Sequence, residues 1–319
     1  MAGDLHWLRG DCHVHSRRSH GGELTPEELV GAARAAGLDF IAVTEHNLDA
    51  AGDPWSRLAG DGLLVIPGQE VVTETGHWLA LGLAPGHVAD WRYGVRDDLI
   101  DRPVAEVQRA GGLCVVAHPH APYPAGTFMY PFDGFDAVEV WNGQWSSDLP
   151  WNADNEAALA EWGRGLAIGV HRHRWTPAIG NSDVHLAGQI GTPQTVVHAA
   201  DLTQHAVLAA LRAGRCWIAG SAAIQLTLVA TAGPSEAGIG EHLPAAGGEP
   251  VTVEVHVSGV PSGTVSLHTD RGRSHQEALP PAGAGTATWS TTDRPTFVRV
   301  EVRHPTGHMA ALTNPVILT

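Results

Sequence analysis

Residues 9–22 read RGDCHVHSRRSHGG, with a single residue between His13 and His15 and with His20 a few positions further on. The run at residues 7–12 that leads into them resembles a short β-strand. In extended backbone near a strand end, His13 and His15 can both turn toward one site with little distortion. The stretch therefore predicts a strand that ends in a group of imidazoles.

Histidine is unusually common in this chain. Its 319 residues include 20 histidines, compared with 19 lysines and arginines together. The histidines are dispersed, and several follow apolar runs directly. Imidazole and carboxylate side chains are the ligands of borderline divalent metals such as Zn, Mn and Fe. The composition therefore directs attention to metal binding.

The overall composition excludes several classes of protein. A hydrophobic fraction of 43% and a charged fraction of 17% are typical of a chain that folds into a globular protein. The net charge of -15 disfavours binding to nucleic-acid backbones or to anionic membranes. We find no signal peptide and no apolar stretch long enough to span a bilayer, and three separated cysteines suit buried thiols in a reducing compartment. We expect a cytoplasmic protein whose oligomeric state is open.

The first two thirds of the chain alternate between buried strands and amphipathic helices. Thr25 is the expected N-cap of one helix, with Pro26 at its first position and Glu28 completing a capping box. Strands are expected at residues 7–12, 40–44, 63–67, 78–83, 113–117, 137–141, 178–180 and 216–219, and helices at 24–36, 103–110, 155–161 and 203–213. This pattern predicts an α/β fold with a mostly parallel sheet, either open or closed into a barrel.

The pattern changes at about residue 220. Short alternating runs separated by Gly, Pro and Ser follow at 224–230, 251–257, 264–268, 286–289 and 297–302. Such runs are typical of an antiparallel sandwich. We therefore expect a barrel over residues 1–220 and a small β-sandwich-like C-terminal domain over residues 221–319.

Polar residues stand at the ends of the predicted strands. In a barrel these ends meet at one mouth, where the chemistry is gathered from several strands. The residues placed there are His13, His46, Glu70, His118 and Asp183. An isolated HxH pair in a histidine-rich chain is easily explained by chance, but the combination of HxH, EH, GxE, AHP and SDxH in this order is not. The placement predicts one metal site.

These motifs resemble those of the polymerase and histidinol phosphatase (PHP) superfamily. The similar stretches are DCHVHS at 11–16, VTEHN at 43–47, PGQE at 67–70, VAHPH at 116–120 and NSDVH at 181–185. The resemblance covers about residues 9–220. Further stretches look like the branch that includes carbaryl hydrolase-like metallohydrolases: EVVTETGHWLALG at 70–82, VEVWN at 138–142, GTPQTVV at 191–197 and RVEVRHPTGHMAALTNP in the tail.

The resemblance implies a distorted seven-stranded (β/α)7 barrel that holds two or three divalent metal ions, Zn, Mn or Fe. By matching motif, one ion is held by His13, His15, Glu70 and Asp183, a second by Glu70, His77 and His118, and a third by His20, His46 and His185. Two positions depart from the family pattern. Glu45 and His20 stand where relatives commonly have aspartate, which leaves the third ion less well defined.

Other residues are candidates for supporting roles. Glu45 is expected to orient a metal-bound histidine, because such imidazoles usually donate their other N–H to a carboxylate or carbonyl. His120 is a candidate proton donor, or else only the neighbour of Pro119. Catalytic roles are also expected for Glu70 and Asp183. The candidates for contact with an anionic substrate, which are otherwise surface charges, are Arg17, Arg18, His171, Arg172, His173 and Arg174.

The leading functional hypothesis is hydrolysis of a small phosphate ester, a monoester or a diester, by a metal-bridging hydroxide. Divalent ions make hydroxide available at neutral pH, and their positive charge attracts an anionic small molecule. The same hydroxide can attack the carbonyl of an ester, amide or carbamate, because a fold does not fix a function. A third reading is a non-catalytic, metal-containing binding module, although every motif position is filled.

Overall fold

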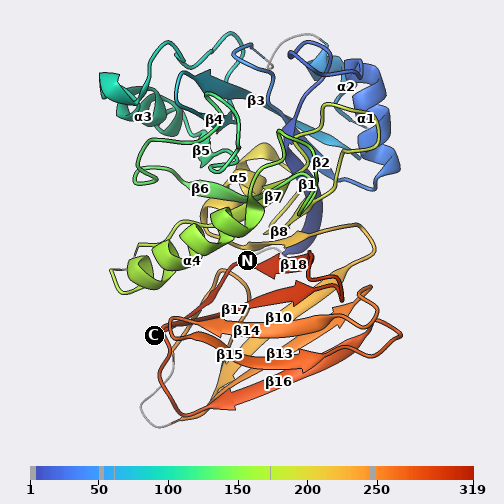
Figure 1. Cartoon of the computed structure of the whole chain (residues 1–319), viewed down its shortest axis with the longest axis vertical. Helices are drawn as coiled ribbons and strands as arrows, with labels where there is room; N and C mark the ends of the chain where they lie inside the picture. The colour runs from blue at the N-terminus through green and yellow to red at the C-terminus, as the bar shows by residue number, and fades with distance from the viewer. Residues whose placement is uncertain (1–4, 50–53, 61, 173, 245–248) are drawn as a thin grey trace.

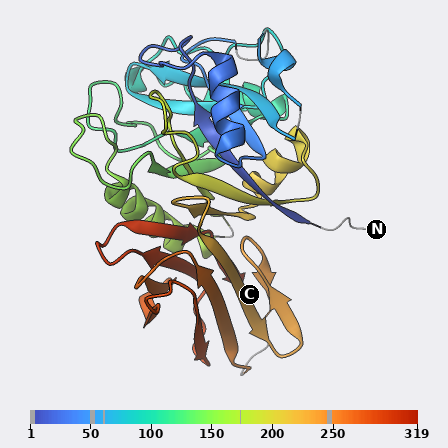
Figure 2. The ribbon, with the colours of Figure 1, turned by 90° about the vertical axis from the view of Figure 1, so that its right-hand side faces the viewer.

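The computed structural model describes residues 5–49, 54–60, 62–172, 174–244 and 249–319. An N-terminal α/β part stacks on a C-terminal part made of strands, as Figure 1 shows. The view turned by 90° in Figure 2 shows the same two layers. Figure 1 also places helix α4 between them, on the side of the α/β part that meets the C-terminal strands.

All helices of the described residues lie in the N-terminal part. They are α1 (Pro26–Ala35), α2 (Trp55–Leu58), the 3-10 helix η1 (Val95–Asp97), α3 (Asp101–Arg109), α4 (Asn155–Val170) and α5 (Gln204–Arg212). The predicted capping box is present at α1, where Thr25 and Glu28 exchange hydrogen bonds. Helix α4 is much longer than the predicted 155–161, because the pattern after Glu161 is weakly amphipathic and glycine interrupts it.

Nine strands form the curled sheet of the N-terminal part. They are β1 (His6–Val14), β2 (Phe40–Val43), β3 (Leu64–Thr73), β4 (Gly76–Leu81), β5 (Leu113–Val116), β6 (Ala137–Asn142), β7 (Ala178–Asn181), β8 (Gln194–Ala199) and β9 (Cys216–Ala219). Their order is β9-β8-β1-β2-β3-β4-β5-β6-β7. One isolated bridge between Val14 and Val184 joins the β1 end to the β7 end, so the sheet curls without a closing ladder among the described residues.

The expectation of a distorted (β/α)7 barrel is met only in part, because the α/β sheet is curled but its strands are not all parallel. Strands β1, β2 and β3 are parallel, as are β5, β6 and β7, but β4 is antiparallel to both of its neighbours. Strand β8 is also antiparallel to β1 and β9. A parallel pair needs a long crossover, whereas the β3–β4 pair closes in a tight turn at Gly76, whose φ of +133° suits glycine. The result is a half-barrel with few helices.

The C-terminal part contains only strands among its described residues. They are β10 (Gln225–Ala232), β11 (Ser235–Ala237), β12 (His242–Leu243), β13 (Val251–Ser258), β14 (Thr264–Thr269), β15 (Gly272–Ala278), β16 (Gly285–Thr291), β17 (Phe297–Arg303), β18 (Met309–Thr313) and β19 (Val316–Leu318). One sheet has the order β11-β10-β13-β16. The remaining strands continue the curled sheet, because β18 pairs with β9.

The hydrophobic core crosses from one part into the other. Phe297, Met309 and Leu312 of the C-terminal strands belong to the same buried cluster as Trp141 and Ile218 of the half-barrel. The side chains of the two C-terminal sheets share a second cluster. The two parts are therefore packed as one body.

The cysteines and the apolar character of the helices were also considered in the sequence. Cys12, Cys114 and Cys216 are buried free thiols, as their apolar surroundings predict. A search of the described helices finds no segment with the length and apolar character needed to span a bilayer.

Candidate metal centre

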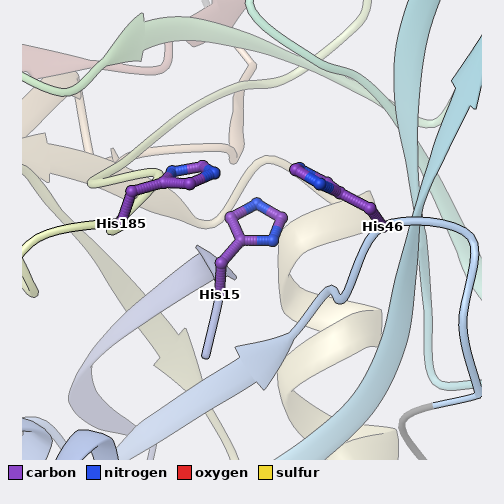
Figure 3. A group of neighbouring side chains, drawn as sticks. All are labelled: His15, His46 and His185. Carbon is purple, nitrogen blue, oxygen red and sulfur yellow. The ribbon is translucent and has the colours of Figure 1, made fainter. Parts of the chain in front are cut away.

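Three groups of side chains converge at one end of the half-barrel, and each group keeps its candidate ligand atoms within 4.8 Å of one another. The groups are His13, His15, Glu70 and Asp183; Glu70, His77 and His118; and His15, His46 and His185. Glu70 belongs to two groups and so does His15, so the three groups form one continuous cluster. Figure 3 shows the rings of the third group pointing toward one another.

These side chains are positioned by strands of the half-barrel and by the residues that follow the strand ends. His13 is in β1, Glu70 is in β3 and His77 is in β4, while the other members follow the ends of β1, β2, β5 and β7. His118 and Asp183 have φ values of +24° and +50°, a region that residues other than glycine rarely adopt. Such backbone is costly and is found mostly where a site needs it, here to turn two ligands inward at strand ends.

Glu70 lies at the middle of the cluster. Its Oε1 atom is 2.8 Å from His77 Nδ1 and 3.1 Å from His118 Nε2. Its Oε2 atom is 3.0 Å from His46 Nε2 and 3.4 Å from His13 Nε2. Because its two oxygens face different histidines, Glu70 is placed to serve two neighbouring cations.

Asp183, which follows β7, faces two histidines of the first group. Its Oδ1 atom is 3.1 Å from His15 Nε2 and 3.3 Å from His13 Nε2. None of these three atoms has a hydrogen-bond partner among the described residues, although all are buried. Leaving buried polar atoms unpaired is costly, and aiming nitrogen and carboxylate lone pairs at one point is what a divalent cation requires. The residues present therefore fit a metal ion.

The electrostatics of the cluster favour cations. Burial raises the pKa values of Glu70 and Asp183, but the surrounding histidines outweigh burial and hold both well below the ordinary range. Burial lowers the pKa values of His13 and His15, yet the carboxylates outweigh it, and the pKa of His15 rises to about 9. The carboxylates are therefore ionised at neutral pH, and protons or metal ions compensate their charge.

Glu139 orients His13. The His13 Nδ1 atom lies 3.2 and 3.3 Å from the two Glu139 oxygens, which leaves Nε2 facing the cluster. Glu139 is fully buried and also accepts from the backbone N–H of His118 and from the amides of Asn142 and Asn181. A carboxylate that holds the far nitrogen of a ligating imidazole sets its tautomer and raises its basicity.

Sequence reasoning assigned no role to Glu139. The available signal was a carboxylate in the otherwise apolar strand run AVEVWN at residues 137–142. A charged side chain in such a run must be paired if the strand is buried. Apart from Asn142, the run does not name its partners, because these come from β1, β7 and the loop after β5.

Glu45 was expected to orient a histidine, and in the structure it is linked to His15 indirectly, through a serine hydroxyl. His15 Nδ1 is 3.1 Å from the Ser19 hydroxyl oxygen, and Ser19 donates to Glu45. Ser16 donates to the other oxygen of the same carboxylate. Glu45 is fully buried, so it anchors the turn that supports His15 without touching the imidazole.

His20 and His120 lie outside the three groups. The side chain of His20 is exposed on the turn after β1, and in the third group the structure places His15 where His20 was expected. His120 pairs with Glu161 of α4 through a 2.7 Å contact. Arg17 and Arg18 are exposed beside the turn that carries Ser16 and Ser19.

The basic cluster after α4 is at the wrong end of the half-barrel for the predicted substrate contact. Helix α4 begins beside the end of β6, where the Asn155 side chain accepts from the backbone N–H of Asn142. It then runs back to the start of β7, so His171, Arg172 and Arg174 are exposed at the end of the strands opposite to the cluster. His173 lies outside the described residues.

Comparison with known proteins agrees with this architecture. The model of the PHP domain matches residues 11–91, and a model described as PHP-associated matches residues 164–216. An uncharacterized protein of Methanocaldococcus jannaschii is 25% identical over 148 residues, which cover 42% of this chain and 82% of that protein.

A solved structure has the same overall fold. It is a two-domain protein from Bacteroides vulgatus, described as containing a predicted PHP-like metal-dependent phosphoesterase, with a TM-score of 0.53 and 18% identity. The similarity covers 99% of this chain and 98% of that one. The resemblance to the carbaryl hydrolase-like branch stays a prediction. The chain thus contains a segment, residues 11–91, that matches the PHP domain, and its matched motifs lie together in one cluster at the strand ends.

Proposed function

We propose that this protein is a metal-dependent hydrolase that cleaves small phosphate esters. The observation that carries the proposal is the continuous cluster in which Glu70 and His15 are each shared between two groups of ligand atoms. The PHP-domain match supports it, and so does the description of the Bacteroides vulgatus protein. A cluster built from adjoining groups suits two or three divalent ions better than one.

The residues that would hold the ions follow from the three groups. His13, His15, Glu70 and Asp183 would hold one, Glu70, His77 and His118 a second, and His15, His46 and His185 a third. Divalent ions such as Zn, Mn or Fe would supply Lewis acidity there and would lower the pKa of a bound water toward about 7.

The remaining side chains prepare this chemistry. Glu139 and the Ser19–Glu45 pair keep His13 and His15 in the tautomers that face the cluster. The His185 Nδ1 atom is 2.9 Å from the backbone oxygen of Asp183, which leaves Nε2 free. The ligands are preorganised, so little reorganisation is needed when an anionic substrate oxygen enters.

The proposal is tested with protein that has been depleted of metal and reloaded with Zn, Mn or Fe. We expect release of nitrophenol from nitrophenyl phosphate or its diester. The His13→Ala variant should lose both bound metal and turnover. A matched control is His308→Ala, which changes an exposed histidine of the C-terminal part and should change neither. Full activity in His13→Ala would show that the chemistry takes place elsewhere.

One observation favours carbonyl hydrolysis as a second candidate. The arginines expected to bind an anion lie at the far end of α4 or are exposed after β1. A neutral ester, amide or carbamate needs no such cation. Turnover of a naphthyl carbamate without phosphate release would therefore replace the leading proposal. If the metal-loaded protein turned over none of these substrates, a non-catalytic binding module would be favoured.

A further inference from the structure

The loop between β5 and β6 brings an aromatic side chain against the second ligand group. The ring centroid of Tyr123 is 6.1 Å from that of His77 and 6.2 Å from that of His118. The Tyr123 side chain is only partly exposed. Tyr123 lies outside all the sequence motifs quoted above, and only the fold brings it next to the ligands.

The backbone of the loop fixes where this ring lies. A Cβ atom on Gly126 would come within 2.4 Å of the Tyr123 ring, so the ring packs directly on the glycine backbone. The Gly126 N–H donates to the Tyr123 carbonyl at 2.9 Å, and Phe128 N–H donates to the Pro119 carbonyl at 2.9 Å.

The loop is also anchored to the β3–β4 turn. A Cβ atom on Gly76 would lie 2.7 Å from Phe128 Cα, so the loop touches the residue that precedes His77. The Met129 N–H donates to the Thr75 carbonyl at 3.0 Å in the same turn. These contacts tie the position of Tyr123 to the hairpin that carries a ligand of the second group.

The Tyr123 hydroxyl has no hydrogen-bond partner among the described residues. Because the ring lies against His77 and His118, the hydroxyl is available beside the second ligand group. A phenol is protonated at neutral pH and can act as a hydrogen-bond donor.

We propose that the Tyr123 hydroxyl contacts the substrate and donates a hydrogen bond to a phosphoryl oxygen at the His77–His118 side of the centre. This inference rests on the proposed function and assigns its substrate-binding donor. Such a donor would provide one of the contacts to an anionic substrate that the basic cluster after α4 is too distant to make. A hydrogen bond to a charged oxygen contributes enough to change affinity by about tenfold to hundredfold.

The test compares three variants with the wild type, all loaded with the same metal. In Tyr123→Phe we expect the affinity for inorganic phosphate, measured by calorimetry, to fall about tenfold or more while metal content is unchanged. The matched control is Tyr130→Phe, which removes a buried hydroxyl from the same loop that already bonds Thr73 at 2.8 Å. Its phosphate affinity should stay within twofold of the wild type.

A third variant, Gly126→Ala, keeps the hydroxyl but displaces the ring that packs on the glycine. It should lower phosphate affinity in the same direction as Tyr123→Phe. Phosphate affinity in Tyr123→Phe within twofold of the wild type would overturn the inference, and so would an equal loss in Tyr130→Phe.

Failure of the proposed function has a different signature. Suppose that the wild type binds phosphate and that Tyr123→Phe weakens this binding, but that no phosphate ester is hydrolysed. The Tyr123 contact is then supported and the phosphoesterase proposal is wrong. If ester hydrolysis is present and Tyr123→Phe changes neither phosphate affinity nor kcat/KM, only the inference falls. A wild type that binds no phosphate overturns the inference.

Discussion

At the scale of single residues, the centre depends on which nitrogen each imidazole presents. His13 must offer Nε2 to the cluster, and it does so because Glu139 takes its Nδ1–H. Glu139 is in turn satisfied by three further donors, two amides and one backbone N–H. A buried carboxylate with four partners is both an orienting group and a structural one.

The first prediction therefore changes Glu139→Gln. The amide cannot accept from all four donors, so we expect metal affinity to fall by about tenfold to hundredfold. The free energy of unfolding should also fall, by about 1–3 kcal/mol, because a buried donor loses its acceptor. Calorimetric metal titration and urea unfolding measure the two effects.

The control for this prediction is Glu254→Gln. Glu254 is an exposed residue of β13 that pairs with His256, far from the centre. It should leave metal affinity unchanged. Unaltered metal affinity in Glu139→Gln itself would mean that the His13 tautomer is set by another group.

At the scale of elements, helix α1 shows how local signals decide a boundary. Thr25 accepts from the Glu28 N–H at 3.1 Å, and the Glu28 carboxylate accepts from the Thr25 N–H at 2.8 Å. Residues Pro26, Leu29, Val30 and Ala33 bury the inner face of the helix. The helix packs beside β1 and β2, whose ends carry histidines of the centre.

We predict that Thr25→Ala lowers the free energy of unfolding by about 1 kcal/mol, because one N-terminal N–H loses its acceptor. Glu28→Gln keeps an acceptor for the Thr25 N–H and should cost less. Chemical denaturation of both variants checks the order. A larger loss in Glu28→Gln than in Thr25→Ala would contradict this account of the cap.

Strands β14 and β17 carry a group that titrates in an accessible range. His268 lies against Glu301 at 3.5 Å, and burial lowers its pKa to about 4, with Arg299, Arg273 and Arg303 acting in the same direction and Glu301 opposing them. Between pH 6.5 and about 4 the unfolded chain therefore binds this proton more readily than the folded chain does.

It follows that the free energy of unfolding contributed by His268 is full above pH 6.5 and is lost as the pH falls toward 4. We predict that His268→Asn, which cannot take up the proton, loses less stability than the wild type over this interval. Urea unfolding at a series of pH values gives the comparison. Parallel pH profiles for the two proteins would show that the pKa of His268 is not lowered in the folded protein.

At the scale of the whole molecule, the change of pattern at residue 220 does not separate two independent bodies. Strand β18 pairs with β9 across that position. The Arg303 guanidinium of β17 contacts both carboxylate oxygens of Glu156 in α4 and lies 5.4 Å from the Trp145 ring centroid. Sheet, core and ion pairs all continue from one part into the other.

We therefore predict that a fragment ending at residue 220 does not fold into a stable monomer. It would expose the β9 edge and the part of the core that Phe297, Met309 and Leu312 cover. Size-exclusion chromatography and a thermal melt followed by circular dichroism test this expectation. A monomeric fragment with a cooperative melt would show that the half-barrel needs no C-terminal strands.

Much of this protein could be read from the sequence by itself. Strand ends, the α1 cap and the identities of the candidate ligands follow from apolar runs, Thr-Pro-Glu spacing and histidines at defined offsets, which are local signals. The β3–β4 reversal and the length of α4 were harder to predict, because a glycine turn and a weakly amphipathic helix leave faint patterns.

Only the tertiary structure decided which side chains meet. The grouping of His15 with His46 and His185, the burial of Glu139 under His13, and the approach of Tyr123 to His77 depend on strand register and on the curl of the sheet. The direction of α4 likewise carries its basic end away from the centre. A local pattern encodes local backbone conformation, whereas distances between side chains far apart in the chain are set only when the sheet pairs its strands and curls.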